Sequence, residues 1–225
     1  MVPYCRPIVL ALAAALTAAC SSTPHESTTP TPKPPPNAAE LTALSKARAD
    51  SARQLSTEAD ARFMTGMISH HAQAIVMAGW APSHGASPSV RTLCARIINA
   101  QQDEIVTMQH WLAVRGLPVP EAKPGPMKMS MNGVEHDMLM PGMLTDEQMH
   151  QLDQARGEEF DRLFLTFMIQ HHKGAVAMVQ DLFGSYGAAQ DETVFKFASD
   201  VSVDQSTEIA RMEKMLAALP PSRPS

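Results

Sequence analysis

One stretch occurs twice in this chain of 225 residues, and it limits the folds that the chain can adopt. Residues 63–78 read FMTGMISHHAQAIVMA, and residues 164–179 read FLTFMIQHHKGAVAMV. The two copies are related by a constant offset of 101 residues, so that His171 lies where His70 lies in the first copy. Each copy combines two adjacent histidines with methionines and aliphatic residues at helical spacing. The repeat therefore predicts two equivalent amphipathic helices.

The segments that follow the two copies also match each other. Gln-x-x-Glu-Ile-x-x-Met begins at Gln101 and again at Gln205, an offset of 104 residues. The duplication thus covers two whole helical hairpins, each of which has an apolar face that it cannot bury alone. Packing the two antiparallel hairpins together buries both faces. The predicted fold is all-α, a pseudo-symmetric four-helix bundle.

Composition agrees with an all-α class and excludes one kind of partner. The chain has only two Trp and two Tyr, and it lacks runs of β-branched residues that alternate with polar ones, which argues against a sheet. The formal net charge of −5 comes without any Lys/Arg-rich run. Nucleic-acid binding requires a basic surface, so nucleic acid is excluded as a partner.

The N-terminal region has the features of an export signal. Residues 1–20 contain Arg6, a short apolar run and then LTAAC ending at Cys20, which resembles a bacterial lipobox. We expect Cys20 to carry a lipid, which would anchor the protein to a membrane of the cell envelope on its periplasmic or extracellular face. The alternative is an ordinary signal peptide cleaved near Ala19. Removal of this region leaves Cys94 as a lone thiol, so no internal disulfide is expected.

Capping and breaker residues predict the boundaries of the remaining segments. Thr57 and Thr145 each begin a sequence with capping-box spacing, and Ser87 precedes a first-turn proline. Gly157 is predicted to lie within one long helix. The expected segments are a disordered Ser/Thr/Pro stalk over 21–39, a short helical lead-in over 40–56, the bundle over 57–218 with helices at 57–80, 88–112, 145–183 and 191–218, a Met-rich linker over 117–144, and a tail over 219–225.

The paired histidines face the predicted core. At 100° per residue, Gln73 falls on the polar side of the first repeat helix, and His71 falls near the middle of the opposite, buried face. His70 is expected at the edge of that face, and His171 and His172 are expected to straddle theirs. A buried imidazole without a partner is costly, so each ring needs either a hydrogen-bond partner or a metal ion. Two such pairs on facing helices favour the metal.

The donor types available favour copper. Di-iron bundles use Glu-x-x-His, but Thr107 follows Glu104 at that spacing. Zinc sites favour Cys or carboxylate beside His, whereas thioether and imidazole together suit copper as Cu(I) or Cu(II). The candidate ligands share the histidine pairs and the helical rows around them: His70, His71, His171, His172, Met67, Met77, Met168 and Met178.

Two further sets of residues are candidates for supporting roles. The residues that could orient the imidazoles or add ligands are Asp60, Glu104, Met108, Asp161, Glu208 and Met212. The residues that could capture a soft ion in the linker are Met127, Met129, Met131, His136, Met138, Met140 and Met143. Methionine is also a common core filler, and Asp60 is also explained as a helix cap. The linker could equally cover a hydrophobic groove of the bundle.

The motifs together resemble a known bacterial family. The paired MIxHHxxAxxM motifs, the PGMLTDEQM segment before the second copy and the Gln-x-x-Glu-Ile-x-x-Met segments are similar to those of domain of unknown function 305, over about residues 57–218. The resemblance implies a ferritin-like helical bundle. Because some members are implicated in copper binding and tolerance, it also implies a copper-binding role for the paired histidines and the methionines beside them.

Three functions remain after these arguments. The leading hypothesis is a lipid-anchored envelope protein that binds copper and buffers or delivers it to an unidentified protein partner, with no catalytic turnover. The alternative is a structural or protein-interaction bundle with hydrogen-bonded core histidines and no metal. An oxidase would need an open coordination position, and no motif in the sequence indicates one.

Overall fold

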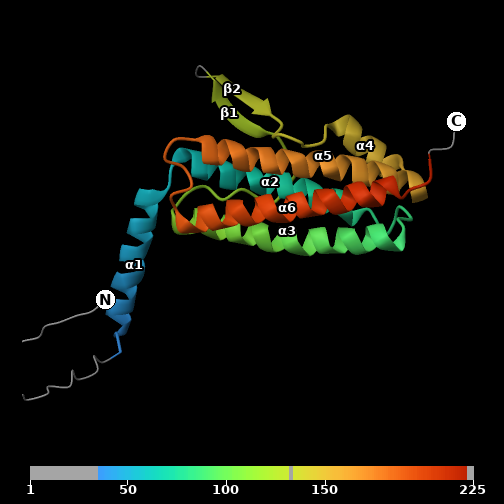
Figure 1. The fold of residues 1–225 in the computed structure, drawn as a ribbon. Coiled ribbons are helices and arrows are strands. Elements are labelled where there is room, and N and C mark those ends of the chain that lie inside the picture. Colours follow the sequence, from blue (N-terminus) through green and yellow to red (C-terminus); the bar gives the residue numbers. More distant parts are fainter. Residues whose placement is uncertain (1–34, 132–133, 222–225) are drawn as a thin grey trace, which may run out of the picture. The chain divides into compact units, whose positions relative to one another are not determined.

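The computed structural model describes residues 35–131 and 134–221 (Figure 1). The described chain from Ala38 onward forms one compact unit. The expected signal segment and Cys20 lie outside the described residues. Within the described residues, no helix has both the length and the apolar character that crossing a membrane requires.

Four long helices build the bundle, and the all-α fold class predicted from the repeat is confirmed. Helix α2 packs against α3, α5 packs against α6, and α2 and α5 join the two hairpins. Figure 1 shows these four helices side by side. The elements are α1 (Ala38–Leu55), α2 (Glu58–Gly79), α3 (Pro88–Val114), β1 (Met127–Met131), β2 (Val134–Met138), α4 (Asp146–Gln154), α5 (Gly157–Gly184) and α6 (Glu192–Ala217).

Helices α2, α3 and α4 begin at the side-chain caps that the sequence predicted. Thr57 and Asp60 form a reciprocal capping box at the start of α2, and Thr145 and Gln148 form another at α4. Ser87 caps α3 ahead of its first-turn proline. These side chains satisfy backbone N–H groups that have no partner within the helix.

The expectation of one continuous helix over 145–183 is wrong. Helix α4 ends at Gln154, and α5 begins at Gly157. Gly157 adopts a φ of +58°, and its N–H donates to the carbonyl of His84 at 2.8 Å. A left-handed backbone conformation is accessible to glycine without the cost that a Cβ imposes, so the chain turns here instead of continuing the helix.

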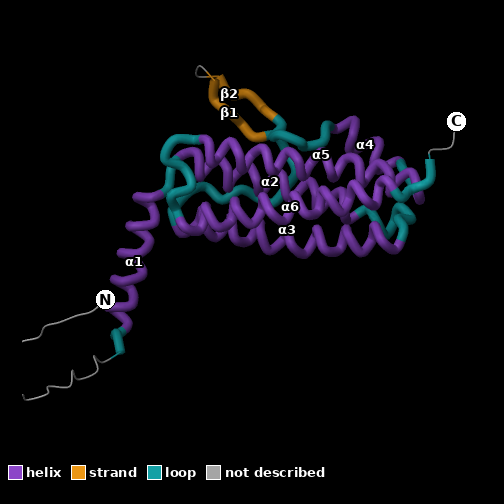
Figure 2. Tube along the Cα trace, viewed as in Figure 1, coloured by secondary structure: helices purple, strands orange, loops and turns teal. Residues whose placement is uncertain are grey.

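The Met-rich linker contains the only β-strands among the described residues, which the all-helical expectation did not include. Strands β1 and β2 pair antiparallel, with Met127 opposite Met138 (Figure 2). The segment after β2 returns to the bundle, where Met140, Met143 and Leu144 are buried. The linker is thus partly structured and partly a cover for the bundle.

The apolar core is divided into two clusters. The first core cluster includes Phe63, Met67 and Trp111, and the second core cluster includes Met77 and Phe164. Helix α2 contributes Phe63, Met64, Met67 and Ile68 to the first cluster and Ala74, Met77 and Ala78 to the second. The histidine pair of α2 lies between these two segments.

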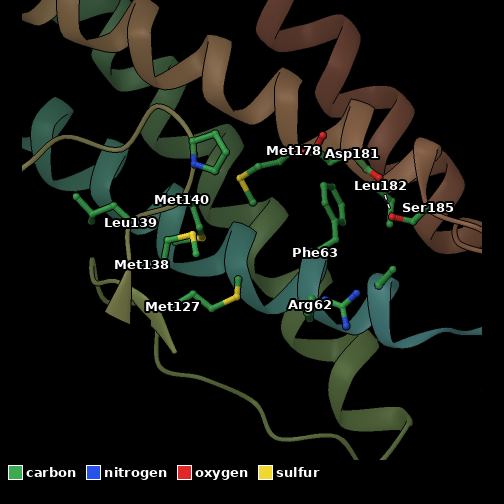
Figure 3. A pocket seen from close by; sticks show the side chains of 12 residues that line it. Arg62, Phe63, Met127, Met138, Leu139, Met140, Met178, Asp181, Leu182 and Ser185 are labelled. Carbon is green, nitrogen blue, oxygen red and sulfur yellow. Dashed lines mark hydrogen bonds between the residues drawn. The ribbon is translucent and has the colours of Figure 1, made fainter. Parts of the chain in front are cut away.

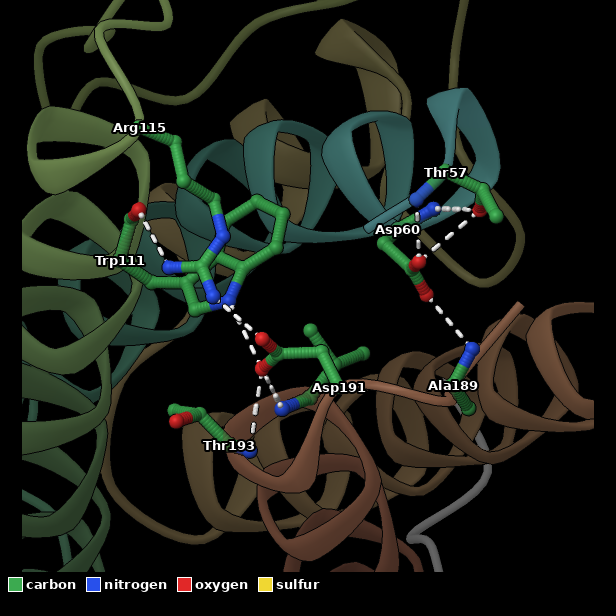
Figure 4. A network of polar contacts seen from close by, with 8 residues as sticks. Thr57, Asp60, Trp111, Arg115, Ala189, Asp191 and Thr193 are labelled. Carbon is green, nitrogen blue, oxygen red and sulfur yellow. Dashed lines mark hydrogen bonds and ion pairs between the residues drawn. The ribbon is translucent and has the colours of Figure 1, made fainter. Parts of the chain in front are cut away.

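A buried polar network joins the hairpins at the start of α6 (Figure 4). Asp191 caps α6, accepts a hydrogen bond from Trp111 Nε1 at 3.1 Å and pairs with the buried guanidinium of Arg115. Nearby, Asp60 Oδ1 accepts a hydrogen bond from the Ala189 N–H at 2.7 Å. A helix cap of the first hairpin therefore also binds the backbone of the second.

Candidate metal centre

Four imidazoles meet in the middle of the bundle. The side chains of His70, His71, His171 and His172 are fully buried, and they are called the imidazole layer below. The ring centroids of His70 and His171 lie 3.8 Å apart across α2 and α5. The expectation that His70 lies at the edge of the buried face is wrong, because the linker and the second hairpin cover the side that an isolated helix would expose.

A backbone carbonyl fixes the tautomer of His70. Its Nε2 lies 3.0 Å from the carbonyl oxygen of Pro141, which can only accept, so Nε2 carries the proton and donates it. Burial, followed by repulsion from a charge on His71, lowers the pKa of His70 from 6.5 to about 3. The ring is therefore neutral near pH 7. Its Nδ1 carries a lone pair and has no hydrogen-bond partner among the described residues.

Carboxylates accept hydrogen bonds from His71 and His172, as the Pro141 carbonyl does from His70. His71 Nε2 lies 2.6 Å from Glu104 Oε2, and His172 Nε2 lies 2.8 Å from Glu208 Oε2. In both rings Nδ1 is buried and finds no partner in the described part of the chain. Of the residues expected to orient the imidazoles, Glu104 and Glu208 have the contacts that this role requires.

His171 is the histidine with the fewest constraints. Neither of its ring nitrogens has a hydrogen-bond partner within the described ranges. Burial, with repulsion from charges on the other imidazoles, lowers its pKa well below 6.5. A neutral ring always presents one nitrogen lone pair, so His171 adds a fourth donor to the layer.

Two glutamines extend the polar layer toward α3 and α6. Gln101 and Gln205 are buried, and each leaves its amide oxygen without a partner among the described residues. With Glu104 and Glu208 they line a cavity of about 220 Å³. The Glu104 and Glu208 side chains are 21% and 20% exposed, so this side of the layer reaches solvent. In the sequence, these glutamines stand out only because they occupy equivalent positions in the two hairpins.

The candidate methionines lie on both sides of the imidazole layer. Met67 and Met178 belong to the first core cluster, whereas Met77 and Met168 belong to the second. The two methionines of each helical row are therefore in different clusters. Met108 lies in the first cluster and Met212 in the second.

Asp60 and Asp161 do not orient imidazoles, and that expectation is wrong. Asp60 is used by the capping box and by Ala189. Both carboxylate oxygens of Asp161 accept from the backbone N–H of Ser87, at 3.1 and 3.2 Å. Backbone amides at helix starts and turns need such acceptors, which explains why the two residues recur at matching positions.

The candidate metal-binding residues of the linker differ in how deeply they are buried. Met140 and Met143 are buried in the first core cluster, Met127 is half-buried, and Met138 is 43% exposed. Met129, Met131 and His136 lie on the paired strands, but their side chains fall outside the described residues.

The end of the linker is clamped over the imidazole layer, a feature that the sequence did not indicate. The Gln73 amide bonds both backbone groups of Leu144, at 3.0 and 2.7 Å. A Cβ built on Gly174 would lie 1.9 Å from the Pro141 carbonyl oxygen, so only glycine permits this approach. Gln73, placed on the polar face by helical phasing, is buried as a result. The Pro-Gly-Met motif before the second repeat was the available signal.

The described residues contain no preformed metal site made only of imidazole, thiolate and carboxylate donors. Within the described residues, no three side chains of the His, Cys, Asp and Glu types are placed to hold one metal ion together. Burial raises the pKa of the Cys94 thiol to about 12, so it remains protonated. A metal site inside the bundle would therefore have to combine imidazole nitrogens with thioether sulfurs.

Comparison with known proteins finds one family and several solved structures. The sequence model described as "Domain of unknown function (DUF305)" matches residues 60–216. A stretch of 58 residues is 38% identical to the uncharacterized protein L153 of Acanthamoeba polyphaga mimivirus, covering 26% of this chain and 38% of the viral protein.

The similar solved structures are helical proteins of the same kind. A DUF305 fragment from Deinococcus radiodurans is 29% identical with a TM-score of 0.60, covering 73% of this chain and 99% of the fragment. A presumed secreted DUF305 protein from Streptomyces coelicolor is 29% identical with a TM-score of 0.59, covering 71% and 91%. CopM, solved in Cu(I)-bound and Cu(II)-bound forms, is 28% identical with a TM-score of 0.52, covering 70% and 95%.

Proposed function

The chain belongs to the DUF305 family, and from this premise we propose that it is an exported protein that binds copper at the imidazole layer, without catalytic turnover. Copper is here the cargo that the protein buffers or delivers.

The observation that carries the proposal is the hydrogen bonding of the rings. His70, His71 and His172 each donate Nε2–H to a carbonyl or carboxylate and leave a buried Nδ1 unpartnered in the described part of the chain. Metal-binding histidines in proteins characteristically donate their other ring nitrogen to such an acceptor. The acceptor holds the ring orientation and makes the free nitrogen a better donor.

The surroundings of the layer favour the monovalent ion. Both core clusters beside it are apolar, and the cost of burying an ion rises steeply with its charge. Neutral imidazoles and nearby thioethers suit Cu(I), which has a preference for soft ligands. The His70, His171 and Met67 side chains are the candidates for holding it. The solved relative CopM is recorded with Cu(I), Cu(II) and Ag bound, which supports this choice of metal.

Replacing His171 with leucine tests the proposal. No described residue donates to or accepts from His171, so leucine removes a metal donor without leaving a protein group unsatisfied. We expect Cu(I) affinity at this layer to fall by at least about 100-fold, measured anaerobically against a competing chelator. The fraction of nitrogen neighbours in the copper X-ray absorption spectrum should fall with it.

His84→Leu is the matched control. His84 is also a buried histidine, but its ring contacts Ser83 and Asp153 away from the imidazole layer. Its replacement should leave Cu(I) affinity unchanged. If His171→Leu binds Cu(I) as the unaltered protein does, the layer is not the site, and a structural bundle is favoured. Oxygen consumption in the presence of Cu(I) would contradict the absence of turnover.

We also propose that the protein is lipid-anchored through Cys20. The LTAAC sequence at the end of the apolar leader supports this, and the solved relative from Streptomyces coelicolor is a presumed secreted protein. Mass spectrometry of the mature N-terminus should find a diacylated or triacylated Cys20. Cys20→Ala should release the protein from the membrane fraction, whereas a mature chain that begins elsewhere without lipid would contradict the anchor.

A further inference from the structure

Three methionine side chains converge on Gly66 in α2. A Cβ placed on Gly66 would lie 2.3 Å from Met127 Cε, 2.9 Å from Met140 Sδ and 3.6 Å from Met178 Cε. These methionines come from β1, from the segment after β2 and from α5, so three separate parts of the chain meet at one point. Met127, Met140 and Met178 are called the thioether cluster below.

The cluster lines a cavity that opens to solvent (Figure 3). The cavity has a volume of about 370 Å³, and its walls include Phe63, Pro141 and Leu182. Met140 and Met178 are 6% and 8% exposed. Met138, the strand partner of Met127, also lines the cavity and is 43% exposed. A fourth thioether therefore lies where the cavity meets water.

The chemistry of the walls favours one class of ligand. Arg62 and Asp181 bring opposite charges to the lining, so it has no strong preference for anions or for divalent cations. Thioether sulfur is neutral, polarisable and a poor donor to Na⁺, Mg²⁺ or Ca²⁺, but a good donor to soft monovalent ions. A single positive charge also costs least to place against apolar walls.

Packing alone does not account for the arrangement at Gly66. Glycine is disfavoured in a helix interior relative to alanine, and alanine at this position would meet the ends of Met127 and Met140. The chain therefore keeps a weak helix former at the point where these side chains end. Leucine would fill an apolar contact equally well, yet all three converging side chains carry sulfur.

From this geometry we infer that the thioether cluster is a second site, specific for a soft monovalent ion such as Cu(I) or Ag(I), with Met138 at its mouth. The site is distinct from the imidazole layer, since none of the residues that line the cavity is a histidine. It needs no imidazole donor, so it stands whether or not the layer binds copper. Its position makes it an entry site on the linker side of the bundle.

The triple variant Met127→Leu/Met140→Leu/Met178→Leu tests the inference. Leucine keeps the apolar volume and removes only the sulfur atoms. Titration of the full mature protein with Ag(I), followed by metal analysis, should show one fewer bound ion per chain in the triple variant. The silver X-ray absorption spectrum should lose its sulfur-only component. An unchanged number of ions with unchanged sulfur coordination would overturn the inference.

Two further variants separate the outcomes. The control triple Met64→Leu/Met149→Leu/Met215→Leu alters buried or partly buried methionines that have no assigned ligand role, and it should retain the ion. Gly66→Ala keeps all the methionines but displaces the ends of Met127 and Met140, and it should weaken binding of this ion at least about 10-fold.

His171→Leu should still bind the ion at the thioether cluster but should lose the ion at the imidazole layer. Loss of ions only in the histidine variant would reject the thioether site and leave the proposed function intact. Loss of an ion only in the methionine triple variant would support the thioether site and reject copper binding at the imidazole layer.

Discussion

Gly174→Ala is expected to destabilise the protein by about 3 kcal/mol or more, measured as the free energy of unfolding in urea. The added Cβ would lie 1.9 Å from the Pro141 carbonyl oxygen and 2.5 Å from Gly142 Cα. Both are backbone atoms, so neither can turn aside as a flexible side chain could. Either α5 bends or the linker leaves the bundle.

Displacement of the linker would break several hydrogen bonds at once. The His70 bond to Pro141 and the Gln73 bonds to Leu144 both depend on its position. Gly184→Ala is the matched control, because it lies in the same helix and a Cβ there would meet no atom within 4 Å. An equal effect of the two substitutions would show that the close approach at Gly174 does not matter for stability.

Acid is expected to unfold the metal-free protein through its buried histidines. The pKa of His70 falls from 6.5 in the unfolded chain to about 3 in the bundle, so below pH 6.5 the unfolded state binds a proton that the folded state does not. Stability is therefore unaffected by this group above pH 6.5 and is lost as the pH falls from 6.5 toward 3. The loss amounts to roughly 5 kcal/mol at the lower end. His171 acts in the same direction.

Urea unfolding at a series of pH values measures this loss. His70→Leu should reduce the dependence of stability on pH between 6.5 and 3, because the variant has one buried imidazole fewer. His110→Gln removes an exposed histidine and should leave the dependence as it is. Equal slopes in the unaltered protein and His70→Leu would show that the ring is not kept neutral by burial.

Repetition and local sequence patterns were sufficient to predict the two hairpins and the inward direction of the histidines. Repetition at a constant offset identified the two halves, and capping residues such as Thr57 and Ser87 marked where helices begin. These features depend on neighbours within a few residues, which the sequence displays directly. The break at Gly157 was missed because a glycine within a helical pattern has a tolerable cost, and the contact with His84 that stabilises the turn is distant in sequence.

The details of the candidate site depended on contacts that periodicity does not contain. Helical phasing placed His70 at an edge because it treats each helix alone, whereas the linker and the second hairpin close that edge. The acceptor for His70 is a backbone carbonyl, which no side-chain motif displays. The convergence on Gly66 likewise combines three segments whose relative positions follow only from the complete fold.

Positions 73 and 174 are equivalent in the two repeats, yet one is glutamine and the other glycine. Gln73 bonds the linker backbone, and Gly174 leaves room for it. A gene duplication produces two identical halves, but only one connection runs between them, and here it crosses one face of the pair. Residues facing the centre can remain alike in both copies, whereas residues facing the connection must diverge. A side chain at position 174, such as the first repeat has at position 73, would therefore fill the space that the linker needs to cover the imidazole layer.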